Sequence, residues 1–296
     1  MDSSLRDRLA AVARERARWA PASGPTPPES DPDRVVDESV ARPKGAPRRK
    51  SRVPPLERIL PGEEISTTSG VCWRHERSLA QWPGADPTLP DRLGRRLAEP
   101  PPEDMAGDTG LDAWRALGLQ GAVFLDLETT GLSATPVFLA GMLMAESGGM
   151  VFRLLLARDY TEEAALLEAV AAEIVRRPVV VTFNGKSYDL PFLRERMGRL
   201  RVDRAEPRAV LDLLHPARRR WGKQLPDCRL ATLEWHLCRR LRAGDIPGKD
   251  IPAAYHRFVR DRDPRPLLKV FTHNLLDLYT LAELTDIVLS APPRGG

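Results

Sequence analysis

Three short apolar runs joined by tight turns most constrain the fold of this 296-residue chain. The runs are Ala122–Leu127, Val137–Ala145 and Met150–Ala157, separated by the turns Thr130-Gly131 and Ser147-Gly148-Gly149. Each run has the length of a strand, and turns this short join neighbouring strands that run antiparallel. We therefore expect a three-stranded antiparallel meander.

The segments after the meander alternate between helix and strand. Thr161 is expected to cap a helix whose apolar residues recur every three or four positions. The order of three strands, helix, strand, helix, strand and helices resembles that of the ribonuclease H-like fold. The predicted fold is thus α/β, a mixed five-stranded sheet flanked by helices. The later elements are expected over 178–183, Leu190–Leu200, Val210–Leu214, Leu230–Leu241 and Leu267–Leu289.

The first 110 residues differ in composition from the rest, because they hold 16 of the 28 prolines. Residues 21–55 show almost no apolar periodicity and contain six basic side chains within 42–52, so we expect residues 1–55 to form a largely disordered Pro/Arg-rich tail. A short helix over Ser4–Ala20 is one option there. The basic run could hold nucleic acid or simply be solvated.

The remaining chain divides into a lead-in and one larger domain. Residues 56–110 are expected to hold a small strand or hairpin over Ile65–Trp73 and a proline-rich link through Pro102. Residues 111–290 are expected to form the ribonuclease H-like domain. This length suits a single core.

Apolar and cysteine content bear on the compartment. No apolar run approaches the roughly 20 residues of a membrane span, so we expect no membrane partner. The three cysteines are odd in number and lack CxxC spacing, which argues against a disulfide framework or a zinc site. A cytoplasmic location is the expectation.

Charge is segregated along the chain. Residues 111–193 carry six basic and ten acidic side chains, whereas residues 194–242 carry 14 and six. An acidic segment followed by a basic one suits a cation site that acts on an anionic polymer. Arginine supplies 39 of the 45 basic residues, so a compositional bias is the alternative. The candidates for phosphate contact or base stacking are Arg218, Arg219, Arg220, Trp221 and Lys223.

Two carboxylates end the first apolar run, within Phe124–Gly131. Alternate side chains of a strand share a face, so Asp126 and Glu128 are expected to point the same way. Adjacent carboxylates repel each other unless they share a cation. The pair therefore indicates a cation site, with solvated acids at a strand end as the alternative.

Two further polar clusters follow apolar elements. Asp189 lies in the connection between the strand over 178–183 and the next helix, where ligands are often held. A helix N-cap is its alternative role. His273 and Asp277 stand four residues apart on the last expected helix and so share one face. A structural hydrogen bond between them is the alternative.

Together these clusters resemble the DEDD (DnaQ-like) superfamily of 3′–5′ exonucleases, over about residues 121–289. The motifs that carry the resemblance are Asp126-x-Glu128-Thr-x-Gly, Asn184 with Tyr188-Asp189-x-Pro-Phe-Leu, and Asp277 on the last helix. Other stretches are similar to the bacterial YprB-type ribonuclease H-like proteins. They are Leu60–Glu64, 212–216, Leu225–Leu230, 245–252 and 265–277.

The resemblance implies a metal-dependent nuclease. Asp126, Glu128, Asp189 and Asp277 would bind two divalent ions, Mg²⁺ or Mn²⁺, whose chemistry suits phosphodiester hydrolysis. The implied partner is nucleic acid, with ends of single-stranded DNA or RNA as substrate. Contacts to it are also expected from Thr129, Asn184 and Tyr188.

The histidine departs from the family pattern. DEDD enzymes place a tyrosine four residues, or a histidine five residues, before the last aspartate, whereas His273 stands four before Asp277. We expect His273 to act as the general base. A shift of one residue rotates a helical side chain by about 100°, so a structural role is the rival.

The leading hypothesis is therefore a metal-dependent 3′–5′ exonuclease. A nucleic-acid-binding module of the same fold with weak or no catalysis is one alternative. A structure-specific endonuclease is the other.

Overall fold

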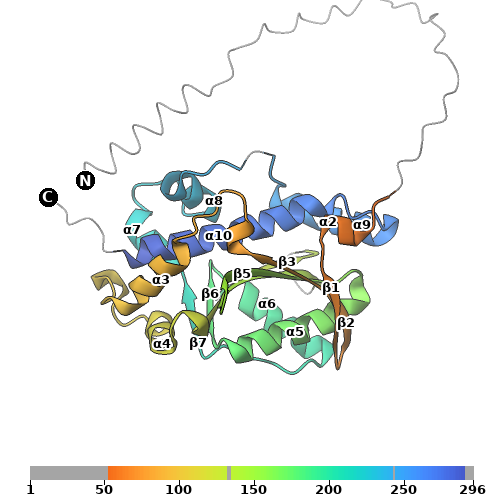
Figure 1. Ribbon diagram of the computed structural model, residues 1–296, viewed down its shortest axis with the longest axis horizontal. Helices are drawn as coiled ribbons and strands as arrows, with labels where there is room; N and C mark the ends of the chain where they lie inside the picture. The colour runs from red at the N-terminus through yellow and green to blue at the C-terminus, as the bar shows by residue number, and fades with distance from the viewer. Residues whose placement is uncertain (1–52, 132–134, 243, 291–296) are drawn as a thin grey trace, which may run out of the picture. The chain divides into compact units, whose positions relative to one another are not determined.

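The apolar runs of the sequence build one mixed sheet. Within residues 53–131, 135–242 and 244–290, which the computed structural model describes, seven strands have the order β1-β2-β5-β4-β3-β6-β7 (Figure 1). The expected tail up to residue 52 lies outside the described residues, as does the optional helix over Ser4–Ala20. The strands are β1 (Glu63–Thr67), β2 (Gly70–Ser78), β3 (Ala122–Thr129), β4 (Val137–Glu146), β5 (Gly149–Leu156), β6 (Val179–Thr182) and β7 (Ala209–Asp212).

The predicted meander is confirmed. β3 pairs antiparallel with β4, and β4 with β5, while β6 and β7 extend the sheet parallel to β3. Because parallel strands end at the same edge of a sheet, the carboxyl ends of β3, β6 and β7 meet there. Asp126 and Glu128 lie near the end of β3, Asp189 follows β6, and Asp212 is the last residue of β7.

The sheet has seven strands in the described residues rather than the expected five, because the predicted hairpin joins it. β2 pairs antiparallel with β5, from Trp73 opposite Leu156 to Ser78 opposite Val151. Cys72 is fully buried in the core beside the sheet. An isolated hairpin is at best marginally stable, whereas this one covers the edge of β5 and shares its core.

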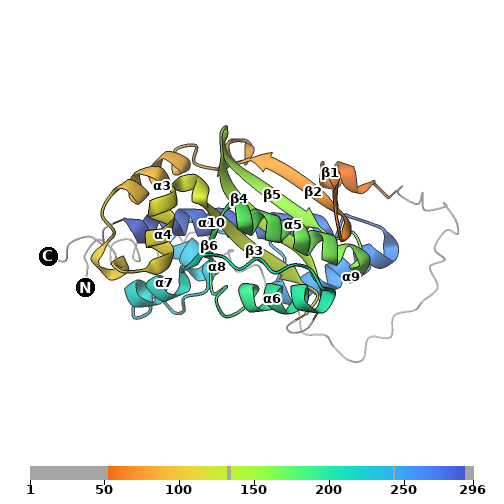
Figure 2. The ribbon, with the colours of Figure 1, turned by 90° about the horizontal axis from the view of Figure 1, so that it is seen from below.

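Helices cover both faces of the sheet. α5 and α6 pack on one face, where Leu166, Val170, Leu193 and Met197 share a core with Leu125 of β3. α10 lies on the opposite face, which Figures 1 and 2 show from two directions. The helices of the described residues are α2 (Leu56–Ile59), α3 (Leu89–Ala98), α4 (Thr109–Leu117), α5 (Glu163–Arg176), α6 (Asp189–Leu200), α7 (Leu214–Trp221), α8 (Leu230–Leu233), α9 (Ile251–Asp261) and α10 (Leu267–Leu289).

The predicted cap of α5 is wrong. The N-cap of α5 is Glu162, which makes no side-chain cap hydrogen bond, whereas Asp159 caps a preceding turn and accepts the Thr161 backbone N–H at 3.0 Å. A 3₁₀ turn over Tyr160–Glu162 follows this cap, and α5 begins only at Glu163. Asp159 stands two residues before Thr161, and both residue types cap helices.

Two other elements differ from expectation. The helix expected over Leu230–Leu241 ends at Cys238, because α8 passes into a π-helical turn and Arg239 adopts a left-handed conformation with φ of 56°. The proline-rich link before Pro102 contains the amphipathic helix α3, whose Arg92 pairs with Asp286 of α10 at 2.8 Å.

No helix in the described part of the chain combines the length and apolar character needed to cross a membrane.

Candidate functional site

Both acidic residues of β3 face α10. Val123 and Leu125 alternate with them and belong to the core on the α5 side. Asn274 of α10 reaches across from the other side, and its Nδ2 donates to Asp126 Oδ2 at 2.7 Å. The Asn274 amide also lies near enough to Glu128 to act against the rise in its pKa. Strand alternation therefore places the two carboxylates on one face, as the sequence predicts.

A glycine on β4 makes room for this contact. Gly141 lies opposite Asp126 in the sheet, and a Cβ atom there would stand 1.7 Å from Asn274 Oδ1. Asn274 is fully buried, and its Oδ1 has no hydrogen-bond partner among the described residues. A side chain at this position would push the amide away from Asp126.

Asp189 is held at the end of a tight loop between β6 and α6. The buried carboxylate of Asp212 organises this loop by accepting the backbone N–H groups of Asn184 at 2.7 Å and Lys186 at 3.1 Å. Gly185 is needed there, since an added Cβ would lie 2.9 Å from Asp189 Oδ2. Asp189 is the first residue of α6 rather than its N-cap, so the capping alternative does not apply.

His273 and Asp277 lie on one face of α10 and contact each other. His273 Nε2 stands 3.3 Å from Asp277 Oδ2, while His273 Nδ1 stands 2.8 Å from Asp245 Oδ2. Arg242 donates from Nη2 to Asp277 Oδ1 at 2.5 Å. Both carboxylate oxygens of Asp277 and both ring nitrogens of His273 are therefore engaged.

The pKa values of the two acids on β3 respond to the carboxylates of α6 and α10. Burial raises the pKa of Asp126 well above its usual value, and the charges of Asp277, Glu128 and Asp189 raise it further. Burial likewise raises the pKa of Glu128, with added repulsion from Asp277 and Asp189. Burial raises the pKa of Asp189 to about 7, against the lowering effect of backbone N–H groups. Residues from β3, α6 and α10 thus share one electrostatic environment.

The donor set fits a hard divalent cation in chemistry. Carboxylate oxygens are the ligands that Mg²⁺ and Mn²⁺ prefer, and a dication would offset the mutual repulsion of buried acids. Among the described residues, no three acidic, histidine or cysteine side chains are already arranged around one ion position. Asp277 is turned to Arg242 and His273, and Asp126 to Asn274, so binding requires these contacts to change.

Two of the expected nucleic-acid contacts are engaged within the protein. Arg220 forms a bidentate ion pair with Asp104, at 2.6 and 2.7 Å, and its guanidinium lies 5.9 Å from the Trp221 ring centre. Arg219 donates to the backbone oxygen of Asp104 at 2.9 Å. These side chains fasten α7 to the segment before α4.

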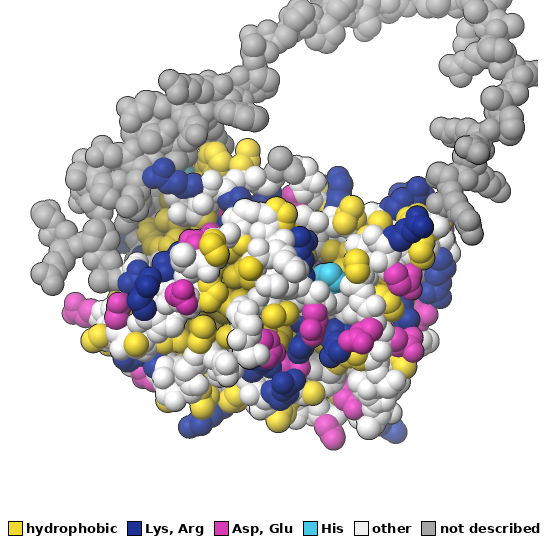
Figure 3. All heavy atoms as spheres, in the orientation of Figure 1, with side chains coloured by type: hydrophobic (Ala, Val, Ile, Leu, Met, Phe, Trp, Pro, Cys, Tyr) yellow, Lys and Arg dark blue, Asp and Glu magenta, His cyan; other side chains and the backbone are white. Residues whose placement is uncertain are grey.

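The other expected contacts differ in exposure. Arg218 and Lys223 are exposed on and after α7, and Tyr188 is 65% exposed beside Asp189. Thr129 donates from Oγ1 to the Gly131 backbone oxygen at 2.6 Å, and Asn184 contributes its backbone N–H to the loop. On the face that Figure 3 shows, basic and acidic side chains are interspersed rather than gathered into one basic patch.

Four residues at the site were not predicted from the sequence: Arg242, Asp245, Glu234 and Asn274. Asn274 carries a usable signal, because it is an amide at a buried position of an apolar helix, next to His273. Arg242 and Asp245 carry none, since they lie in an irregular segment whose path across α10 follows no periodic pattern.

Fold and site together define the class of protein. The chain belongs to the RNase_H superfamily, whose profile matches residues 123–289 and so spans β3 to α10.

A particular relative is the uncharacterized protein YprB of Bacillus subtilis, which is 31% identical over 166 residues. The match covers 54% of this chain and 40% of that protein, so the chain corresponds to less than half of its relative.

Two solved structures are also similar. The family B DNA polymerase of Pyrobaculum calidifontis matches with 17% identity and a TM-score of 0.45, over 57% of this chain and 24% of the polymerase. An ExoI/SSB-Ct complex matches with 18% identity and a TM-score of 0.29, over 51% of this chain and 43% of that chain.

Proposed function

We propose that this protein is a metal-dependent nuclease, and specifically a 3′–5′ exonuclease that hydrolyses phosphodiester bonds of DNA or RNA. The supporting observation is that burial and the charges of Asp277 and Asp189 raise the pKa of both Asp126 and Glu128, which brings carboxylates from three elements of a ribonuclease H-like fold together. Buried carboxylates that raise each other's pKa are costly unless a cation binds them. Membership of the RNase_H superfamily agrees with this assignment.

The four carboxylates would hold two Mg²⁺ or Mn²⁺ ions. When bound, such ions activate water and stabilise the leaving oxygen of a phosphodiester. Asn274 would orient Asp126 through its hydrogen bond. An amide carries no net charge, so it would give up the Asp126 oxygen to a divalent cation. Asp212 would keep Asp189 in position through the loop that it organises.

His273 would handle the proton of the attacking water. Asp245 fixes the ring through Nδ1, so Nε2 is the nitrogen directed at Asp277 and the carboxylate cluster. A neutral imidazole whose second nitrogen is held by a carboxylate is a suitable general base near neutral pH. The same two contacts suit the structural role equally well, and the Asp277–His273 distance of 3.3 Å permits either.

A nuclease assay tests the proposal. Purified protein with Mn²⁺ or Mg²⁺ should release the label of 3′-labelled single strands first. The same protein should shorten 5′-labelled strands stepwise, because degradation starts at the 3′ end. Asp126→Ala should abolish the activity, whereas Asp203→Ala, an exposed aspartate after α6, should not. Absence of degradation by the wild type, or equal degradation by Asp126→Ala, would refute the proposal.

A nucleic-acid-binding module with weak catalysis is the second candidate. The specific observation in its favour is that Arg242 already neutralises Asp277, whose other carboxylate oxygen contacts His273. Binding of labelled single strands without turnover in Mn²⁺ would support it. A circular single strand separates the third option, because only an endonuclease cuts a substrate without ends.

A further inference from the structure

Arg242 connects the proposed catalytic carboxylates to a second group of acids. Its Nη2 donates to Asp277, its Nε donates to Glu234, and its Nη1 lies 3.4 Å from Asp245 Oδ2. The Arg242 side chain is only 9% exposed. The guanidinium of Arg242 carries a single positive charge. It occupies Asp277, which the proposed function needs as a ligand of a divalent cation.

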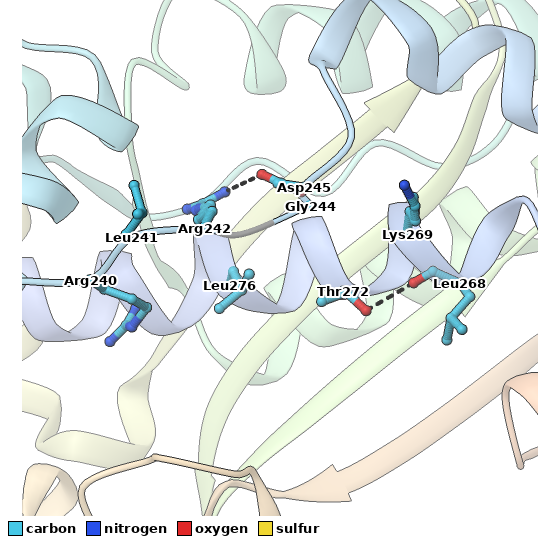
Figure 4. Close-up of a pocket in the computed structure, with 9 residues that line it drawn as sticks. All are labelled: Arg240, Leu241, Arg242, Gly244, Asp245, Leu268, Lys269, Thr272 and Leu276. Carbon is cyan, nitrogen blue, oxygen red and sulfur yellow. Dashed lines mark hydrogen bonds and ion pairs between the residues drawn. The ribbon is translucent and has the colours of Figure 1, made fainter. Parts of the chain in front are cut away.

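The same arginine lines two cavities on either side of its segment. One cavity of about 310 Å³ lies between Arg242 and the side of α10 that carries Lys269, Thr272 and Leu276 (Figure 4). The other, of about 320 Å³, is lined on its far side by Trp235. Both cavities open next to the residues that contact Asp277 and His273, so a strand of nucleic acid can approach Arg242 from either one.

The charge of the first cavity suits phosphate. Arg240, Arg242 and Lys269 line it against a single acid, Asp245, and Lys269 is exposed. Both arginines also pair with acids outside the lining, Arg240 with Glu234 and Glu283 and Arg242 with Glu234 and Asp277, so a phosphate must displace one of these partners. Guanidinium groups bind phosphate oxygens in the same bidentate manner in which they bind carboxylates. A phosphate in this cavity therefore competes with Asp277 for Arg242.

Release of Asp277 leaves the rest of the network in place. Glu234 is 1% exposed and keeps a second partner, because Arg240 Nη1 stands 3.0 Å from Glu234 Oε1. Arg242 can retain its Nε contact with Glu234 while Nη2 turns to another acceptor. The exchange thus breaks one ion pair and leaves no buried acid without a cation.

We propose that Arg242 exchanges Asp277 for a backbone phosphate of the bound strand, so that nucleic-acid binding and divalent-cation binding assist each other. This inference rests on the proposed function, since it assumes that Asp277 is a metal ligand. Without a strand, Arg242 holds Asp277 and weakens cation binding. With a strand, the freed carboxylate binds the cation. By thermodynamic linkage, the cation must then raise the affinity for the strand by the same factor.

Calorimetric titration with Mn²⁺ alone tests the first half. Arg242→Gln should bind Mn²⁺ about tenfold more tightly than the wild type, because Asp277 loses its competitor. Arg240→Gln removes the same charge two residues away but frees no ligand, so its Mn²⁺ affinity should stay within about twofold of the wild type. Equal or weaker Mn²⁺ binding by Arg242→Gln, or an equal gain in both variants, would overturn the proposal.

Binding of a short single-stranded DNA with nuclease-resistant phosphorothioate linkages tests the second half. Mn²⁺ should tighten binding of this probe to the wild type by at least about fivefold, measured by fluorescence anisotropy against a chelator. In Arg242→Gln the same factor should be clearly smaller, because only the direct attraction between the cation and the strand remains. An equal factor in both proteins would contradict the exchange.

A second variant covers a folding defect in the first. Arg242→Lys keeps the positive charge near Glu234 but cannot bridge Glu234 and Asp277 at once, so it should show a smaller gain in Mn²⁺ affinity. The two proposals fail separately. Coupling that depends on Arg242 without strand degradation refutes the nuclease, whereas degradation with unchanged coupling refutes the exchange.

Discussion

Two groups of buried acids lie on opposite faces of the sheet and are neutralised in different ways. On the α5 side, Glu163 is 2% exposed and pairs with Arg196 at 2.6 Å, while Glu173 pairs with Arg177 at 2.6 Å. On the α10 side, Asp126 accepts a hydrogen bond from the amide of Asn274, and burial together with like charges raises its pKa.

The difference distinguishes structure from function. An acid with its own arginine is part of the architecture, because the pair is complete without any ligand. Acids that repel one another at a sheet edge are incomplete, in the sense that they lack counter-charges. Keeping them there lowers the stability of the folded protein. Arg242 lies between these cases, since it satisfies the buried Glu234 and also Asp277.

The largest expected effect comes from breaking a complete pair. Glu163→Gln should lower the free energy of unfolding by about 3–5 kcal/mol, because the buried Arg196 would lose its carboxylate. Glu163 also accepts the Val137 backbone N–H at 2.9 Å, which ties β4 to α5. Chemical denaturation measures the change. The matched control is Glu206→Gln at an exposed pair with Arg194, where a loss below about 1 kcal/mol is expected. Similar losses at the two sites would contradict the distinction.

On the other face the corresponding change should damage activity and spare stability. Asp126→Asn should reduce nuclease activity by about 10²–10³, the scale for loss of one group that stabilises developing charge. In chelator its melting temperature should equal or exceed that of the wild type, because one of several repelling charges is gone. Initial rates with labelled single strands and thermal melts provide both readouts. A clear loss of metal-free stability would mean that Asp126 belongs to the architecture.

A third change disrupts the hydrogen bond between Asn274 and Asp126, which supports the acids on the α10 side. Gly141→Ala should destabilise the protein by about 1–3 kcal/mol, since its Cβ would stand 1.7 Å from Asn274 Oδ1. Activity should fall as well, because Asn274 could no longer hold Asp126. Gly148→Ala is the control, as a Cβ there meets nothing within 4 Å. Equal effects of the two alanines would show that the Asn274 contact is dispensable.

The sequence predicts the acids of the site better than their surroundings, for physical reasons. The period of two in β3 and the spacing of four in α10 determine which side chains share a face, so Asp126 with Glu128 and His273 with Asp277 are local inferences. The Arg242 contact joins residues 35 positions apart through an irregular segment. Nothing in the local pattern of the chain encodes such a contact.

The fold follows the same rule. The meander β3–β5 comes from short turns and is predictable, whereas the pairing of β2 with β5 joins segments some 77 positions apart, as in the contact between Glu76 and Arg153. The prediction of five strands left out β1 and β2, because the hairpin that they form joins the sheet through the long-range pairing of β2 with β5. The arginines of α7 likewise suggested a nucleic-acid surface, because sequence alone cannot show that Arg220 pairs with Asp104.

The smallest expected effect is a pH dependence confined to the incomplete group. Burial raises the pKa of Asp189 to about 7, above its value in the unfolded chain. A carboxyl with a raised folded-state pKa stabilises the fold while it is protonated. That contribution is complete below about pH 4 and is lost as the pH rises through about 7.

In chelator, the wild type should therefore lose stability relative to Asp189→Asn as the pH rises, by less than about 1.4 kcal/mol between pH 6 and 7. Taking the difference between the two proteins cancels every other titrating group that they share. Saturating Mn²⁺ should remove or reverse the dependence, because a bound cation favours the carboxylate. If the stability difference between the wild type and Asp189→Asn does not change with pH, Asp189 is not one of the repelling acids. It would then no longer count among the four proposed metal ligands.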